Sequence, residues 1–270
     1  MPSTAGAAAQ DRARGGTVIA AQLYTVRDQI KDPSHVGGVL ARLREIGYSA
    51  VEVAGLGPGV ARRFGQELAR ADLTACAAHA PLERLTGDLA AVAAECQEWG
   101  CRYVVVPGLP NEYRSAAGIK RFAREADDIA RDLHPFGLKL AYHNHSFELE
   151  RWDGQTGLEA LFGAAQTLQA ELDTYWLQYG GANPAEWILR LKHRVALVHL
   201  KDMAVVGGKT VMAEVGEGNL DWARILDACR TAGTDWLVVE QDECRRDPIE
   251  SLAISFSNLT RLMTDAGNEA

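Results

Sequence analysis

Short apolar runs alternate along the chain with longer stretches in which apolar residues recur at helical spacing. Apolar or β-branched runs of about four to eight residues, bounded by turn residues, are typical of buried strands. The predicted strands are 17–24, 49–55, 73–80, 103–108, 138–145, 168–176, 195–202 and 236–242. The stretches between them predict amphipathic helices, and several end at a glycine suited to a helix C-cap, namely Gly47, Gly100, Gly137 and Gly233.

Eight strand–helix units in 270 residues predict an α/β protein built as a single (β/α)8 TIM barrel. A doubly wound open sheet is the alternative, and it normally carries a glycine-rich turn after its first strand. Here that position reads "QLYTVRDQ" and contains no glycine. No proline- or serine-rich linker divides the chain, so we expect one barrel domain over residues 17–265 behind a flexible tail of residues 1–16.

Composition narrows the choice of partners. The net charge of −8 argues against a nucleic-acid backbone or an anionic membrane as the main partner. No apolar run reaches the roughly 18 residues that a membrane span requires. The five cysteines are scattered without a CxxC pair, which favours reduced thiols and a cytoplasmic location. We therefore expect a small-molecule partner, and a homo-oligomer is compatible with the sequence.

The stretch "YHNHSFELE" at residues 142–150 carries two histidines one residue apart. Side chains of a strand alternate between its faces, so Leu138, Leu140 and Tyr142 should face the helices. His143 and His145 should then face the barrel interior. Because the active site of a TIM barrel lies at the C-terminal ends of its strands, both histidines are expected at the catalytic mouth.

The other predicted strands also end in inward polar residues. These residues are Gln22, Glu52, His79, Glu171, Asp173, His199, Lys201, Glu240 and Asp242. Each has a structural alternative: Lys201 and Glu52 could form one ion pair, His79 could be a hydrogen-bonded core histidine, and Trp176 could serve packing alone. Strands five to eight together, however, end in a histidine, an aspartate, a histidine and a glutamate on one face. Gathering such groups in one cavity is costly unless a divalent cation binds them, and mixed nitrogen and oxygen donors favour Mn, Zn, Fe, Co or Ni over Ca.

The chain resembles the xylose-isomerase-like TIM barrels of the sugar phosphate isomerase/epimerase superfamily, and within it the inosose-dehydratase-like, keto-sugar branch. The segments that carry the resemblance, in order, are "AQLYTVRD", "YHNHSFELE", "LDTYW" followed by "GGANP", "VHLKDM", "VGEGNLDW" and "VVEQDE". The resemblance implies metal ligands at Asp173, His199 and Glu240. At the fourth ligand position, where many relatives have glutamate, this chain has His143, which is expected to take that place.

The same resemblance implies one divalent metal ion (Mn, Zn, Fe, Co, Ni or Mg) that polarises a sugar carbonyl. A flanking base then removes the neighbouring proton to give a metal-bound enediolate. The expected catalytic residues are Glu240, His145 and Lys201, and a histidine with its ordinary pKa suits proton transfer near neutral pH. The expected substrate-binding residues are Glu148, His79, Gln22, Glu52 and Trp176.

The expected function is therefore isomerisation or epimerisation of a keto-sugar or cyclitol. Dehydration of the same substrates, as in an inosose dehydratase, and non-catalytic sugar binding are the alternatives. A metal-dependent DNA phosphodiesterase shares the barrel, but the charge of −8 and the absence of extra histidine ligands count against it. No basic phosphate cradle is evident beyond Lys201 and Lys209, which favours an unphosphorylated substrate. In "VGEGNLDW", Asn219 could cap a helix, and the glycines could either approach the substrate or serve only a turn.

Overall fold

The computed structural model describes residues 17–54, 56 and 61–268, so the predicted tail of residues 1–16 lies outside the described residues. Eight parallel strands close into a barrel in the order β1-β12-β9-β8-β5-β4-β3-β2. They are β1 (Val18–Gln22), β2 (Ala50–Val53), β3 (Thr74–His79), β4 (Tyr103–Val106), β5 (Lys139–His143), β8 (Gln169–Asp173), β9 (Val195–Leu200) and β12 (Trp236–Val239). All eight predicted strands are confirmed, and the fold is a (β/α)8 TIM barrel.

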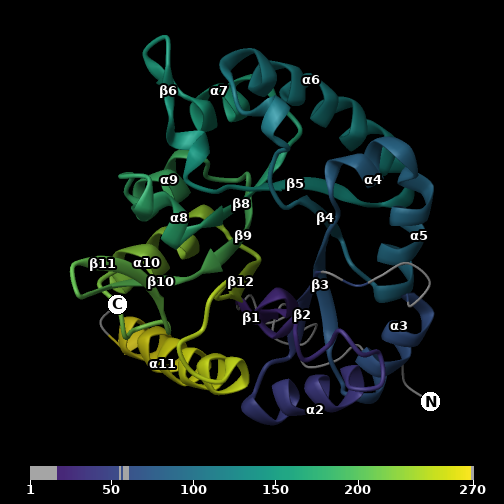
Figure 1. Cartoon of the computed structure of the whole chain (residues 1–270), viewed down its shortest axis with the longest axis vertical. Helices are drawn as coiled ribbons and strands as arrows, with labels where there is room; N and C mark the ends of the chain where they lie inside the picture. The colour runs from purple at the N-terminus through teal and green to yellow at the C-terminus, as the bar shows by residue number, and fades with distance from the viewer. Residues whose placement is uncertain (1–16, 55, 57–60, 269–270) are drawn as a thin grey trace.

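Helices surround the strands as an outer ring (Figure 1). They are α2 (Val36–Ile46), α3 (Ala61–Arg70), α4 (Leu82–Gly87), α5 (Leu89–Trp99), α6 (Ala116–Leu133), α7 (Gly157–Ala164), α8 (Thr174–Tyr179), α9 (Pro184–Arg190), α10 (Trp222–Ala232) and α11 (Pro248–Asn268). Short 3₁₀ turns η1 (Leu23–Val26), η2 (Asn111–Tyr113), η3 (His134–Phe136) and η4 (Phe147–Leu149) complete the connections. Among the described helices, none is both long and apolar enough to cross a membrane.

The hydrophobic core has two layers, one outside and one inside the barrel wall. The outer layer joins strands to helices and contains Leu138, Leu140 and Tyr142, as the alternation predicts. The inner layer is built largely from small side chains such as Ala20, Ala50, Ala141 and Ala196, with Val18, Tyr103 and Trp236 among the larger members. The apolar layer fills the lower part of the barrel, and the polar side chains occupy its C-terminal end.

All eight barrel strands end before their predicted ranges do, and three of these early ends affect the site. β5 ends at His143 and β12 at Val239, so His145 and Glu240 lie beyond regular strand. β8 ends at Asp173, whose side chain accepts a hydrogen bond from the backbone N–H of Trp176 and so begins α8. Trp176 is therefore on a helix, and its predicted strand position is wrong. Two hairpins, β6–β7 (Arg151–Trp152, Gln155–Thr156) and β10–β11 (Asp202–Val206, Lys209–Ala213), were not predicted.

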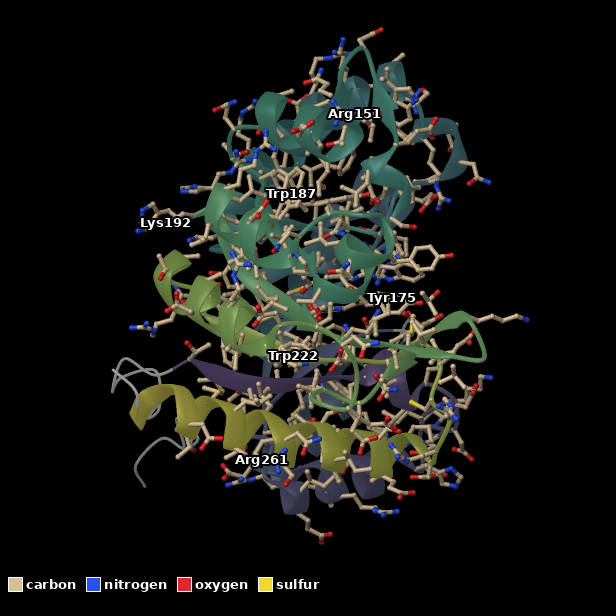
Figure 2. All side chains as sticks on the ribbon, turned by 90° about the vertical axis from the view of Figure 1, so that its left-hand side faces the viewer. Arg151, Tyr175, Trp187, Lys192, Trp222 and Arg261 are labelled. Atoms are coloured by element: carbon tan, nitrogen blue, oxygen red, sulfur yellow. The ribbon has the colours of Figure 1, made fainter. Side chains whose placement is uncertain are left out.

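The segment "VGEGNLDW" leads into α10, but Asn219 is not the cap. Asp221 occupies that position and accepts a hydrogen bond from the backbone N–H of Arg224. The preceding N–H groups bond to the buried carboxylate of Asp202, and so does the indole N–H of Trp222; the backbone donors are Gly216, Gly218 and Leu220. Trp222 lies within the body of the protein, whereas Lys192 points away from its surface (Figure 2). The glycines thus serve the turn rather than the substrate.

Candidate metal centre and active site

The four predicted metal ligands converge at the barrel mouth, and we call them the upper cluster. They are His143, Asp173, His199 and Glu240, from the ends of β5, β8, β9 and β12, which are neighbours in the barrel. Each offers one donor atom, and these four atoms lie within 4.8 Å of one another. His143 Nε2 is 3.3 Å from Asp173 Oδ2, and His199 Nδ1 is 2.8 Å from Glu240 Oε2. The structure therefore brings together the set that the sequence predicts.

Lys201 is fully buried beside the upper cluster. Its Nζ lies 3.0 Å from Asp173 Oδ2, 2.8 Å from Glu240 Oε2 and 2.6 Å from Asp242 Oδ2. Burial opposes the charged form, but these three carboxylates raise the pKa of Lys201 above its usual value, so the ammonium remains charged. An ion pair between Lys201 and Glu52 is not formed, because Lys201 is paired with these three carboxylates instead.

A second group, the lower cluster, lies one layer deeper in the barrel. It consists of Glu52 on β2, His79 on β3, Glu171 on β8 and His199, whose donor atoms also lie within 4.8 Å of one another. Glu171 is two residues before Asp173 and shares its strand face, which explains the greater depth. His79 Nε2 lies 2.9 Å from Glu171 Oε2, and His199 Nε2 lies 2.6 Å from Glu52 Oε2. His199 thus belongs to both clusters, one through each ring nitrogen.

Strong electrostatic coupling follows from the burial of the lower cluster. Burial and the neighbouring carboxylate of Glu171 raise the pKa of Glu52 to about 7. Burial would also raise the pKa of Glu171, but His199 and His79 lower it well below the usual range. In turn, the carboxylates of Glu171, Glu240 and Glu52 outweigh burial and raise the pKa of His199 well above its usual value. Positive charge is therefore favoured at the junction of the two clusters.

His145 lies just beyond β5, with its ring centroid 4.9 Å from that of His143 and 5.4 Å from that of Trp176. The chain leaves room for it at Gly108 (φ +148°), where an added Cβ would lie 3.2 Å from His145 Cε1. Burial, followed by the nearby His143, lowers the pKa of His145 to about 3. The imidazole is therefore neutral at physiological pH, which corrects the expectation of an ordinary histidine pKa.

Glu148 and the pair Gln22 and Glu52 occupy positions different from those expected of substrate contacts. All three are 0% exposed. Glu148 accepts hydrogen bonds from the Tyr142 hydroxyl at 2.6 Å and from the His145 backbone N–H at 2.9 Å, so it holds the β5 turn in place. Gln22 donates a hydrogen bond from Nε2 to Glu52 Oε2 at 2.8 Å. The carboxylate of Glu148 and the amide of Gln22 are thus engaged within the protein rather than offered to a substrate, and Glu52 is fully buried.

A cavity of about 450 Å³ opens above the upper cluster. His79, His143, His145, Glu240 and Asp242 line it on the polar side. Apolar side chains form the opposite wall, among them Val53, Val92 and Trp99. A volume of this size with a few convergent polar groups is typical of a small-molecule site, and it accommodates a monosaccharide or cyclitol ring.

The donor chemistry of the upper cluster fits a divalent metal ion. Two imidazole nitrogens and two carboxylate oxygens form a mixed set that suits Mn, Zn, Fe or Co. The donor separations of 2.8, 3.3 and 3.9 Å are those of ligands that surround a single ion with bonds of about 2.0–2.2 Å. His143 contributes a nitrogen to this set, in the place where the resemblance implies a glutamate in many relatives.

Comparison with known proteins identifies the family. Residues 40–259 match the sequence model of the family described as xylose isomerase-like TIM barrel. The chain belongs to this family. A curated relative, the rhizopine catabolism protein MocC of Rhizobium meliloti, is 26% identical over 164 residues, which cover 54% of this chain and 50% of that protein. The match thus spans about half the length of the curated relative.

Solved structures share the fold over almost the whole chain. A sugar phosphate isomerase/epimerase from Parabacteroides distasonis superimposes with a TM-score of 0.78 at 20% identity, covering 91% of this chain and 98% of that one. The probable 3-DHS dehydratase AsbF from Bacillus anthracis superimposes with a TM-score of 0.69 at 14% identity, covering 90% and 99%. At such identities these similarities establish the xylose-isomerase-like barrel.

Proposed function

We propose that this protein is a divalent-metal-dependent isomerase or epimerase of an unphosphorylated keto-sugar or oxidised cyclitol. The observation that carries the proposal is the upper cluster, because four mixed donors from four neighbouring strand ends meet beside a sugar-sized cavity that His143 and Glu240 line. Membership of the xylose isomerase-like family supports it, and proteins with the same fold include a sugar phosphate isomerase/epimerase and a probable dehydratase.

The upper cluster would hold the metal through His143, Asp173, His199 and Glu240. A divalent ion bound there supplies Lewis acidity toward a sugar carbonyl and its neighbouring hydroxyl. Lys201 fixes the carboxylates of Asp173 and Glu240 through its ion pairs, so both oxygens keep their positions whether or not substrate is present. Because its ammonium is surrounded by carboxylates, positioning is a better role for Lys201 than direct contact with a substrate oxyanion.

Glu240 is the proposed base that takes the proton next to the carbonyl. Lys201 and His199 hold its pKa well below the usual range despite burial, so it is ionised at neutral pH. Both of these ion pairs use Oε2, which leaves Oε1 to face the substrate from the cavity wall. Epimerisation needs a second proton-transfer group, and His145, which lines the same cavity, is proposed for that role: its neutral imidazole would take up a proton before returning it to the substrate.

The cavity favours an unphosphorylated substrate. The arginine among its described lining residues, Arg84, is paired with Glu95 at 2.9 Å. Lys201 is paired with three carboxylates, and Lys209 lies on the exposed part of the β10–β11 hairpin. A phosphate group would therefore meet carboxylates without an unpaired cation from these residues, which is unfavourable.

Dehydration is a second candidate, and Asp242 favours it. This carboxyl group lines the cavity, and burial together with the neighbouring Glu240 raises its pKa. A carboxyl group with a raised pKa holds a proton more readily and is better suited to deliver it to a leaving hydroxyl. The proton next to the carbonyl would be removed first. The β-hydroxyl would then leave with the proton from Asp242, which would release water and form a carbon–carbon double bond.

Proton exchange in D2O tests the proposal. Chelator-treated protein is reloaded with Mn²⁺ and incubated with keto-sugars and inososes, and NMR follows deuterium at the carbon next to the carbonyl. Deuterium in an isomer or epimer supports the proposal, and a dehydrated product supports the second candidate. Binding without any exchange in this panel overturns both in favour of a sugar-binding barrel.

Matched histidine variants sharpen the assignment. His145→Ala should slow exchange about 100- to 10,000-fold while metal content stays unchanged, because it removes one proton-transfer group. His35→Ala, an exposed position at the start of α2, should exchange at the wild-type rate. Exchange at the wild-type rate in His145→Ala would show that this histidine only lines the cavity.

A further inference from the structure

The lower cluster contains two buried carboxylate oxygens that lack a hydrogen-bond partner among the described residues. They are Glu52 Oε1 and Glu171 Oε1, and both residues are 0% exposed. His79 Nε2 lies 3.5 Å from Glu52 Oε1 without forming a hydrogen bond to it. A buried carboxylate without compensation is costly, so two in contact with the same pair of imidazoles require a reason.

Charge balance around the two clusters points in the same direction. The carboxylates that converge there belong to Glu52, Glu171, Asp173, Glu240 and Asp242. The one ammonium group among the described residues of these clusters is Lys201. One divalent ion in the upper cluster leaves part of the remaining negative charge to be offset, either by protons on the imidazoles of His79 and His199 or by a second cation in the lower cluster.

The imidazole of His79 is arranged to accept a cation. The backbone N–H of Tyr24 bonds to Gln22 Oε1, so Gln22 directs its Nε2 donor toward Glu52 and His79. Gln22 Nε2 lies 3.4 Å from His79 Nε2, and the same imidazole nitrogen lies 2.9 Å from Glu171 Oε2. Either a proton on Nε2 or a metal ion bound by its lone pair keeps this nitrogen and the carboxylate oxygen from repelling each other.

We propose that the lower cluster is a second divalent-cation site, held by Glu52, His79, Glu171 and Nε2 of His199. Two imidazoles and two carboxylates make a complete four-ligand set, the arrangement that suits a structural Zn²⁺ ion. His199 is shared, with Nδ1 toward the upper cluster and Nε2 toward the lower one. Occupancy of both sites requires loss of both ring N–H protons, which leave for solvent as the ions bind.

This second site goes beyond the proposed function, on which it rests only in treating the upper cluster as the first metal site. Its role is to fix the orientation of His199, and thus one ligand of the upper cluster, from below.

Metal stoichiometry of the whole chain tests the inference. Chelator-stripped protein is loaded with Zn²⁺, desalted and analysed for metal per chain by mass spectrometry. The wild type should retain about two ions, and Glu171→Gln about one, because the amide removes a charged ligand. Asp173→Asn should also retain about one, lost this time from the upper cluster. Glu217→Gln, a surface glutamate outside both clusters, is the matched control and should retain about two.

Cobalt distinguishes the two sites and guards against unfolded variants. In Co²⁺-loaded protein, the visible absorption of a four-coordinate ion should be lost in Glu52→Gln or Glu171→Gln and kept in Asp173→Asn. About one ion in the wild type, unchanged in Glu171→Gln, would overturn the second site and show that protons balance the lower cluster. That result would leave proton exchange intact, whereas failure of the proposed function would abolish exchange at either stoichiometry.

Discussion

Asp202 and the lower cluster both contain fully buried carboxylates, but the two sites differ in their hydrogen-bond donors. Asp202, fully buried where β10 begins, is surrounded by neutral N–H donors. They are the backbone N–H groups of Met203 at 2.8 Å, Gly216 at 2.9 Å, Gly218 at 3.0 Å and Leu220 at 3.2 Å, and the Trp222 indole at 2.6 Å. The lower cluster buries Glu52 and Glu171 as completely, yet among the described residues one oxygen of each has no hydrogen-bond donor.

The difference separates a carboxylate that stabilises the fold, Asp202, from the two carboxylates of the proposed second metal site. Donors on all sides stabilise the charge of Asp202 without any further partner, and they fix the loop before α10 in return. Glu52 and Glu171 face histidines and each other, so their stability depends on what is added between them. Burial alone does not distinguish these cases, whereas hydrogen-bond satisfaction does.

The largest expected effect concerns a carboxylate that faces the cavity. Glu240→Gln keeps the shape of the side chain but removes its negative charge and its ability to take a proton. Deuterium exchange into substrate should fall about 100- to 10,000-fold. NMR measures the rate, and circular dichroism checks the fold. A rate within twofold of the wild type would assign the base to another group.

Asp202→Ala should show the second largest effect, and it should appear in stability. Removing this acceptor leaves several buried N–H groups unpaired, so the free energy of unfolding should fall by about 3–5 kcal/mol. Urea denaturation measures this change. The molecules that remain folded should retain the wild-type metal content. Loss of metal without loss of stability would contradict the contrast drawn between the two acids.

Glu171→Gln should show an effect of different size in the two metal states. Without metal, the variant should be less stable than the wild type by about 1–3 kcal/mol, because His79 and His199 lose the charged carboxylate that they contact. With Zn²⁺ the difference should widen, since the variant also loses the stabilisation that a ligand bound to the native state provides. Denaturation with and without chelator measures both. Equal curves in the two states would count against metal in the lower cluster.

Trp222→Phe should have the smallest effect. It removes only the indole donor to Asp202, and the four backbone donors remain. The free energy of unfolding should fall by about 0.5–1.5 kcal/mol, as for one lost hydrogen bond. Thermal unfolding gives the measurement. A loss as large as that of Asp202→Ala would show that the indole, rather than the backbone, dominates this interaction.

The sequence is informative wherever a residue lies on a regular strand. Alternation correctly directs Asp173 and His199 inward, because a parallel barrel strand has one face toward the helices and one toward the interior. Alternation also places His143 beside them, although the motif "HNH" alone is weak evidence for a metal ligand. Strand periodicity and the barrel count thus predict most of the upper cluster.

Alternation fails where strands end and where partners come from distant segments. Glu148 lies beyond β5, in a turn that returns its carboxylate to Tyr142 rather than to the cavity. The signal for Asp202 is spread over residues 203–222, and its meaning depends on a loop that no local periodicity describes. Glu171 shares a face with Asp173, but only the distances show that it meets a different set of partners.

Closure of the barrel has a consequence for how the protein can be monitored. The last strand, β12, docks between β9 and β1, with Trp236 opposite Leu197 and Val18. Only that docking brings Glu240 to the ligands from β5, β8 and β9, which occur earlier in the chain. A chain arrested before this step, during synthesis or refolding, lacks one wall of the upper cluster. Tightly bound metal per milligram of protein would then measure the fraction of barrels that have been completed.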